Sequence, residues 1–269
     1  MGNARTQIAP TTLRLGVALA FAACVLLVTA VPGVFSVDDD NYLVTVTALQ
    51  RGQLHVVGTE GLPPSRELLF FEPATRFREV TATPVYSTAP PLYAFMAWPF
   101  AWFGLFGLIA LNVLAYCATG ALVFAMTRRL SQQPRTPWLA LGIFMLCTYS
   151  IEYAQGLWPH MLAVALTTAA ANAAMRARAE GGARDAAVSG LCAGLAIGTR
   201  YQNLALALLI GAGAVLWGTK RARIAAGFTA GLALPLMAAS TINALRLGTW
   251  NPVSKGPWYI TLRLPDESI

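Results

Sequence analysis

Charge is scarce in this sequence: Asp, Glu, Lys and Arg make up 12% of its 269 residues, whereas a soluble globular domain has about 25%. Hydrophobic residues make up 56%, and the mean hydropathy is +0.56. So few charges nearly exclude a soluble enzyme of this size, and so many apolar residues exclude a disordered chain. The composition predicts an all-α polytopic membrane protein.

Histidine and cysteine are also rare, with two and four residues. Two histidines exclude a zinc site made of histidine alone. The four cysteines all fall in predicted spans, where they are expected to act as small apolar residues, and no disulfide framework is visible. The net charge of +7 comes without a basic patch interleaved with aromatic residues, so no nucleic-acid partner is expected. The excess of positive charge is typical of the cytoplasmic loops of membrane proteins.

A membrane-spanning helix needs about 20 predominantly apolar residues. The first such segment, 13–31, follows Arg5 and Arg14 and ends at Pro32-Gly33. A cleaved signal peptide is the alternative, but the apolar stretch is longer than a usual signal-peptide core and Val31-Pro32 is a poor cleavage neighbourhood. We therefore expect an uncleaved first span. Six further spans are predicted within 106–244, at 106–126, 138–153, 158–175, 186–199, 204–217 and 224–244.

The apolar run 92–126 allows two interpretations: two tight spans, or an interfacial helix over 90–103 followed by one span. The second places the basic residues of all short loops on one side of the membrane, with Arg200 as the exception. Every acidic residue except Glu180 and Asp185 then falls on the other side. We therefore expect about seven spans in one module over 1–269. Its N-terminus is cytoplasmic, and its C-terminal tail, 245–269, lies outside the plasma membrane.

Two small-residue patterns predict close helix packing. Gly190, Gly194 and Gly198 recur every four residues, and Gly227 and Gly231 repeat this spacing. Such ridges let helix backbones approach closely in lipid. The pattern indicates a helix bundle and carries no chemistry.

A long polar segment, within an outer loop over 36–104, follows the first span. It opens with Asp38-Asp39-Asp40 and continues into 41–50, where Tyr42, Val46 and Leu49 share one helical face. This pattern predicts an amphipathic helix on the membrane surface. The three aspartates have two interpretations: a helix N-cap, or a carboxylate cluster that could accept a proton from a hydroxyl group or hold a divalent cation beside a phosphate.

Several segments resemble one family. SVDDDNYLVTVTALQRGQL (36–54) is similar to the segment after the first helix of GT-C glycosyltransferases, where an acidic pair precedes a tyrosine and an amphipathic helix. TPVYSTAPPLYAFMAWPFAWFGLFG (83–107) resembles the interfacial helix of that superfamily, and the RRL at 128–130 resembles the end of its next span. SGLCAGLAIGTRYQN (189–203) and NALRLGTWNPVSKGPWY (243–259) resemble later elements, in the family's order.

The resemblance implies an enzyme that takes a sugar from a polyprenyl-phosphate carrier at the outer face of the plasma membrane. Relatives by fold include protein O-mannosyltransferases and the aminoarabinose transferase that modifies lipid A. An Asp of the first outer loop acts as base in such enzymes. Alignment on Tyr42 places the acidic pair on Asp38 and Asp39, but the third residue, Asp40, leaves the choice open. Many relatives also use a divalent metal ion, so a metal cofactor remains an open expectation.

A lipid phosphate needs a cation, and Arg200, beside Tyr201, is the best candidate because it is the basic residue of the short outer loops. The alternative for Arg200 is a helix-end side chain that reaches the membrane surface. Lys255 is a weaker candidate for the same phosphate. Glu152 and His160 flank a short outer turn and could complete a metal site with Asp39; the favoured alternative is an interfacial turn anchored by Trp158.

Superfamily members usually continue beyond the seventh span. The resemblance therefore implies that this chain is either truncated or a minimal module whose acceptor is bound by a partner chain. The competing hypothesis is a catalytically silent membrane subunit or scaffold. A transporter is disfavoured because no internal repeat is visible and the charges avoid the centres of the predicted spans.

The predicted topology can be tested by cysteine labelling in intact cells. Ser65→Cys should react with a membrane-impermeant maleimide and Glu180→Cys should not, because the two positions lie on opposite faces. The unmodified chain, with its four native cysteines, is the control for background labelling. The reverse pattern would overturn the orientation.

Overall fold

The computed structural model describes residues 4–33, 37–54 and 89–254; the side chains of 4–10, 37, 38, 40 and 44 are not described. Every regular element in these ranges is an α-helix. The predicted outer loop and the tail from 255 onward therefore lie largely outside the described residues.

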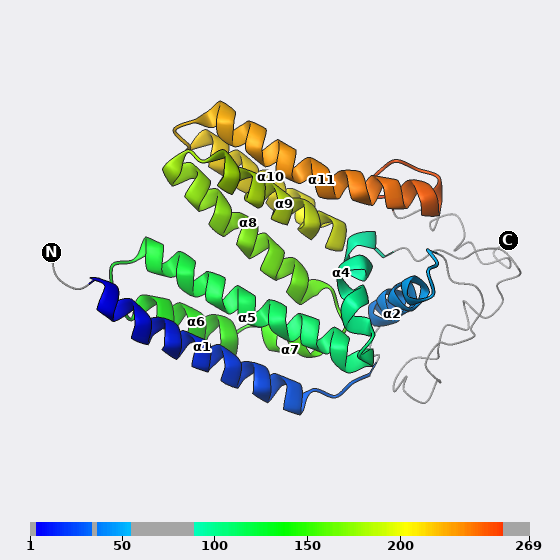
Figure 1. Ribbon diagram of the computed structural model, residues 1–269, viewed down its shortest axis with the longest axis horizontal. Helices are drawn as coiled ribbons and strands as arrows, with labels where there is room; N and C mark the ends of the chain where they lie inside the picture. Colours follow the sequence, from blue (N-terminus) through cyan, green and yellow to red (C-terminus); the bar gives the residue numbers. More distant parts are fainter. Residues whose placement is uncertain (1–3, 34–36, 55–88, 255–269) are drawn as a thin grey trace, which may run out of the picture.

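Two groups of helices make up the fold (Figure 1). The first group is α1 (Ala4–Thr29), α2 (Val37–Gln50), α4 (Pro91–Ala101), α5 (Gly104–Leu130), α6 (Thr136–Leu146) and α7 (Ser150–Gln155). The second group is α8 (His160–Glu180), α9 (Ala183–Thr199), α10 (Asn203–Leu216) and α11 (Arg221–Leu247). Helix α8 packs on α5 of the first group and on α9 and α10 of the second, so it joins the two. Each group has its own buried apolar cluster.

Three of the described helices are long and apolar enough to cross a membrane: the Thr11–Thr29 part of α1, α5 and α11. Helix α1 presents apolar side chains outward, with Leu13, Phe21 and Val28 exposed by 69%, 71% and 85%. Apolar surface of this extent is stable in contact with lipid and costly in water. The chain is therefore an all-helical protein with the character of a membrane protein. The count of seven spans stays a prediction, because α6 and α10 are apolar but shorter than a full span.

The two ends of the bundle differ in charge. The end of α5, the start of α6 and the α8–α9 and α10–α11 turns lie together at one end, on the left of Figure 1. We call this the basic end; these segments carry Arg128, Arg129, Arg135, Arg176, Arg178, Arg184, Lys220, Arg221 and Arg223. The Arg176 guanidinium donates a 2.6 Å hydrogen bond to Asp185 across the α8–α9 turn. The opposite end, which we call the α4 end, holds α2, α4 and the α7–α8 turn.

Helix α4 is short and separate from α5. Pro91 occupies its first turn, where a missing N–H costs nothing. Pro99 lies near its end, and Gly104, with φ of 63°, starts the next helix. The structure therefore agrees with the interpretation of 92–126 as a short helix followed by one long helix. The placement of α4 at the membrane interface remains a prediction.

The predicted single span over 138–153 is wrong. The structure ends α6 at Leu146 and begins α7 at Ser150. The Thr148 hydroxyl donates a 2.7 Å hydrogen bond to the Phe144 carbonyl, and it accepts hydrogen bonds from the Ser150 hydroxyl at 2.7 Å and from the Ser150 N–H at 3.2 Å. These local bonds replace helical backbone bonds and divide the segment.

The contact between α9 and α11 depends on glycine, as the sequence predicts. A Cβ at Gly190 would lie 2.0 Å from the Phe228 carbonyl oxygen, and one at Gly231 would lie 2.0 Å from the Ala187 carbonyl oxygen. The two backbones therefore touch directly. Gly198, the third glycine of the series, packs against a different helix: a Cβ there would lie 2.3 Å from Leu92 of α4.

Alanine at Gly190 should destabilise the protein by about 1 to 3 kcal/mol, since the added methyl group overlaps a backbone oxygen that cannot move alone. Gly142 of α6 is the matched control, because nothing lies within 4 Å of a Cβ there. Gly142→Ala should be neutral or stabilise by about 0.5 to 1 kcal/mol, as alanine does in helix interiors. Thermal unfolding in detergent measures both, and equal midpoints for the two variants would contradict the tight contact.

Candidate functional site

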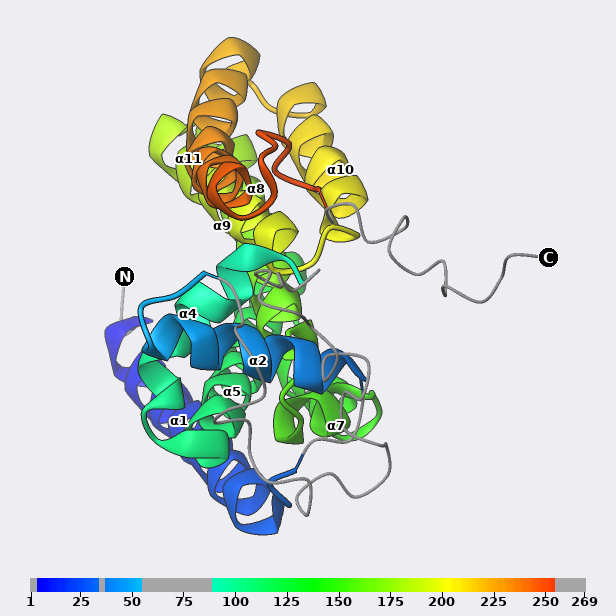
Figure 2. The same cartoon turned by 90° about the vertical axis from the view of Figure 1, so that its right-hand side faces the viewer.

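Helix α2 lies across the α4 end of the bundle, over α4 (Figure 2). Its buried face is the predicted one, since Tyr42 and Val46 are buried and Leu49 packs against the same cluster. The helix ends at Gln50, and Gly52, two residues later, has φ of 71°. Gln53 and Arg51 donate their backbone N–H groups to the Ala48 carbonyl. This turn satisfies the last carbonyls of the helix in the way a glycine C-terminus usually does.

The three aspartates lie inside the first turns of α2, not before the helix. Asp39 is almost completely buried, with 1% of its surface exposed. The side chains of Asp38 and Asp40 are outside the described residues. Carboxylates in this position interact favourably with the positive end of the helix dipole. The backbone therefore agrees with the interpretation that the aspartates stabilise the start of the helix.

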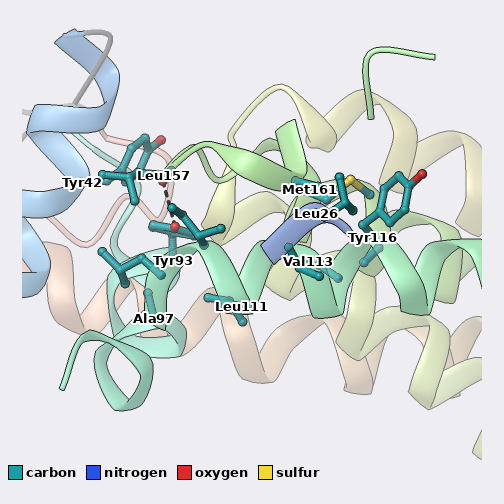
Figure 3. Packing of buried hydrophobic residues seen from close by; sticks show 14 of the residues in the cluster. Leu26, Tyr42, Tyr93, Ala97, Leu111, Val113, Tyr116, Leu157 and Met161 are labelled. Carbon is teal, nitrogen blue, oxygen red and sulfur yellow. Dashed lines mark hydrogen bonds between the residues drawn. The ribbon is translucent and has the colours of Figure 1, made fainter. Parts of the chain in front are cut away.

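Asp39 and Tyr42 both lie near Tyr93 of α4, a completely enclosed phenol. The rings of Tyr42 and Tyr93 meet edge to face, 5.0 Å apart (Figure 3). Burial raises the pKa of Tyr93, and the nearby charges of ionised Tyr42 and Asp39 raise it further. Tyr93 is therefore a permanent hydrogen-bond donor, and its hydroxyl donates to the Leu157 carbonyl at 2.9 Å.

Asn112 of α5 holds the same turn from the other side. Its amide Nδ2 donates to the carbonyls of Gly156 and Trp158, at 2.8 and 2.9 Å. Three consecutive carbonyls between α7 and α8 thus receive side-chain hydrogen bonds. Such bonds matter in a low-dielectric interior, where a bare carbonyl is costly.

A second polar group lies where α9 and α11 end. The Tyr201 hydroxyl donates to the Ser254 carbonyl at 3.0 Å, and the Asn243 amide donates to the Asn251 carbonyl at 3.0 Å. Burial raises the pKa of Tyr201, and a hydrogen bond with Asn243 and the charge of Arg246 act against this rise. Arg200, partly exposed, follows the last residue of α9.

Arg246 is a buried cation that the sequence analysis missed. It lies in the last turn of α11 with 4% of its surface exposed, and its Nη1 donates to the Ala89 carbonyl at 3.4 Å. The available signal was an arginine two residues beyond the predicted apolar run 224–244. Its burial depends on the approach of residue 89, which is distant in sequence.

The start of α4 connects the two polar groups. Ala89 accepts the hydrogen bond from Arg246, Leu92 packs against Gly198 of α9, and the ring of Tyr93 contacts Tyr42 of α2. Arg246 and the helix that carries Asp39 therefore both contact one five-residue segment, 89–93. The sequence predicted the aspartate run of α2 and Arg200, which follows α9, as separate candidates. In the fold, α2 and α9 both contact α4.

The predicted metal ligands Asp39, Glu152 and His160 are not gathered. Glu152 is exposed on α7, whereas His160 stacks on Tyr153 with ring centroids 4.6 Å apart. Among the side chains that the structure describes, no three His, Cys, Asp or Glu residues lie together in a way that could hold a metal ion. Lys255 lies outside the described residues, so its predicted role stays a prediction.

Comparison of the chain with protein-family models, with curated proteins and with solved structures finds no match.

Replacing Tyr93 by Phe should lower the free energy of unfolding by about 1 to 3 kcal/mol, because the buried Leu157 carbonyl loses its donor. Tyr149→Phe removes a phenolic hydroxyl from a side chain that is 77% exposed and is the matched control. Thermal unfolding of both variants in detergent tests this. If the two lose the same stability, the Tyr93 hydrogen bond does not hold the α7–α8 turn.

Proposed function

We propose that this protein is a membrane glycosyltransferase that moves a sugar from a polyprenyl phosphate to an acceptor hydroxyl at the outer face of the plasma membrane. The observation that supports this function best is the arrangement around residues 89–93. There, α2, which carries the aspartates, contacts Tyr93, and Arg246 donates to the Ala89 carbonyl. A sugar–phosphate donor needs both kinds of group: a carboxylate near the attacking hydroxyl and a cation near the phosphate.

An aspartate of the run 38–40 is the base in this proposal. The acceptor oxygen attacks the anomeric carbon and its proton passes to the carboxylate, while the bond from that carbon to the phosphate oxygen breaks. The polyprenyl phosphate leaves with the bonding electron pair and needs no general acid. In-line attack inverts the anomeric centre, as in inverting glycosidases.

Arg200, Tyr201 and Arg246 are assigned to the donor phosphate. Arginine suits this role because its planar guanidinium can bind two phosphate oxygens and stays charged at all relevant pH values. Lys255 is also assigned to the donor phosphate, from the sequence alone. A divalent metal ion would also neutralise the phosphate, and Asp38 and Asp40 are the carboxylates nearest in sequence to the proposed base. A partner chain would supply the acceptor-binding part.

One observation favours a second candidate, a catalytically silent subunit. Asp39 is 1% exposed, and a carboxylate buried at the start of a helix stabilises that helix. In this case the run would stabilise α2 and α4 without touching a substrate. The two candidates differ in what happens when the carboxylates are replaced by amides of the same shape.

Asp38→Asn or Asp39→Asn, whichever replaces the base, should abolish sugar transfer while leaving membrane insertion intact, because an amide cannot accept the proton. The assay is release of polyprenyl phosphate from polyprenyl-phosphate sugars by the full chain in native membranes. Glu180→Gln, an exposed carboxyl at the basic end, is the control and should keep full activity.

Full activity in the Asp38→Asn/Asp39→Asn double variant would show that neither residue is the base. Absence of transfer by the unmodified chain with every donor tried, together with normal membrane insertion, would favour the silent subunit.

A further inference from the structure

A cleft opens between α1 and α5 at the basic end, far from the site described above. It has a volume of about 370 Å³. Its lining comes from three residues of α1 and five of α5, among them Thr11, Thr12, Leu15, Phe124, Arg128 and Arg129. Both helices are long enough to span the membrane, so the cleft opens where the two spans reach the membrane surface.

The lining changes from polar to apolar along the two helices. Thr11, Thr12 and the two arginines lie toward the helix ends, and Leu15 and Phe124 lie one turn deeper. Residues three and four apart share a helix face, which explains why Phe124 and Arg128 line the same cleft. A ligand that fits has an anionic head and an apolar tail.

The surroundings favour the same kind of ligand. Helix α1 presents Leu13 and Val17 outward, exposed by 69% and 61%, so acyl chains can lie along it. The neighbouring turns at this end are also rich in Arg and Lys. Basic clefts between membrane helices at the cytoplasmic surface are suited to anionic phospholipid head groups.

We propose that this cleft binds the phosphodiester head group of an anionic phospholipid. Arg128 and Arg129 pair with the phosphate oxygens, and the upper part of one acyl chain lies over Leu15 and Phe124. The proposal is independent of the glycosyltransferase function and of the residues assigned to it. A free phosphate would share the charged contacts and would leave the apolar part of the cleft unused.

Native mass spectrometry of the full chain in detergent tests the proposal, with phosphatidylglycerol and phosphatidylcholine as the two probes. Phosphatidylglycerol should bind more tightly. Arg128→Gln/Arg129→Gln should weaken its binding about 30-fold, since each basic residue near the surface contributes about 1 kcal/mol. Arg221→Gln/Arg223→Gln removes two exposed arginines from the same end and should leave this binding unchanged.

A second variant fills the cleft without changing its charge. Ala125 lines it, so Ala125→Phe should weaken phosphatidylglycerol binding while the protein keeps its unfolding temperature. Equal losses in the two double-arginine variants would overturn the proposal in favour of diffuse surface charge. Unchanged binding in Ala125→Phe would exclude the cleft. Displacement of the lipid by millimolar inorganic phosphate would identify a site for the free anion instead.

Discussion

The carbonyl groups of Gly156, Leu157 and Trp158 have to be hydrogen-bonded where the chain leaves α7 and enters α8. Asn112 and Tyr93 supply those bonds. A buried backbone carbonyl without a hydrogen bond is costly, so this non-helical backbone requires side-chain donors. The donors come from α5 and α4, and the turn they hold fixes the start of α8. Since α8 packs on α5 of the first group and on α9 and α10 of the second, this turn helps to place the two groups relative to each other.

The same requirement positions the candidate site. Tyr93 is fixed by its bond to Leu157 on one side and by the ring of Tyr42 on the other. This fixes α4 under α2 and brings Asp39 to the start of α4. On the opposite side, the direct contact of α9 with α11 allows both helices to end near α4. Leu92 then packs on Gly198, and Arg246 reaches Ala89. Bundle packing and site geometry are therefore one arrangement.

Local features of the fold were predictable from the sequence. The apolar run after Arg14, the prolines at 90 and 91 and the four-residue glycine spacing each act over one or two helical turns, and the structure agrees with them. The division between α6 and α7 was not predicted, because the apolar pattern continues through Thr148 while its hydroxyl competes for backbone bonds. The partner of Gly198 was also missed, since an isolated glycine pattern does not reveal which helix lies opposite.

The candidate site was predictable only in part. Asp38 to Asp40 and Arg200 stand out because charges are scarce, but scarcity does not reveal which charges meet. Arg246 does not stand out in the sequence, because its hydrogen-bond partner, the Ala89 carbonyl, is more than half the chain away. Among the described side chains, the structure does not bring Asp39, Glu152 and His160 together as a metal-binding group; Glu152 is exposed and His160 packs against aromatic rings.

The central claim is that the α4 end receives a sugar carried on a lipid phosphate. The most direct measurement is extraction of lipids from the purified chain, followed by mass spectrometry of the extract. The account predicts a polyprenyl phosphate, with or without its sugar, that is retained by the unmodified chain and lost from an Arg200→Gln variant. Absence of any polyprenyl phosphate from the unmodified chain, purified from membranes that contain it, would contradict the account.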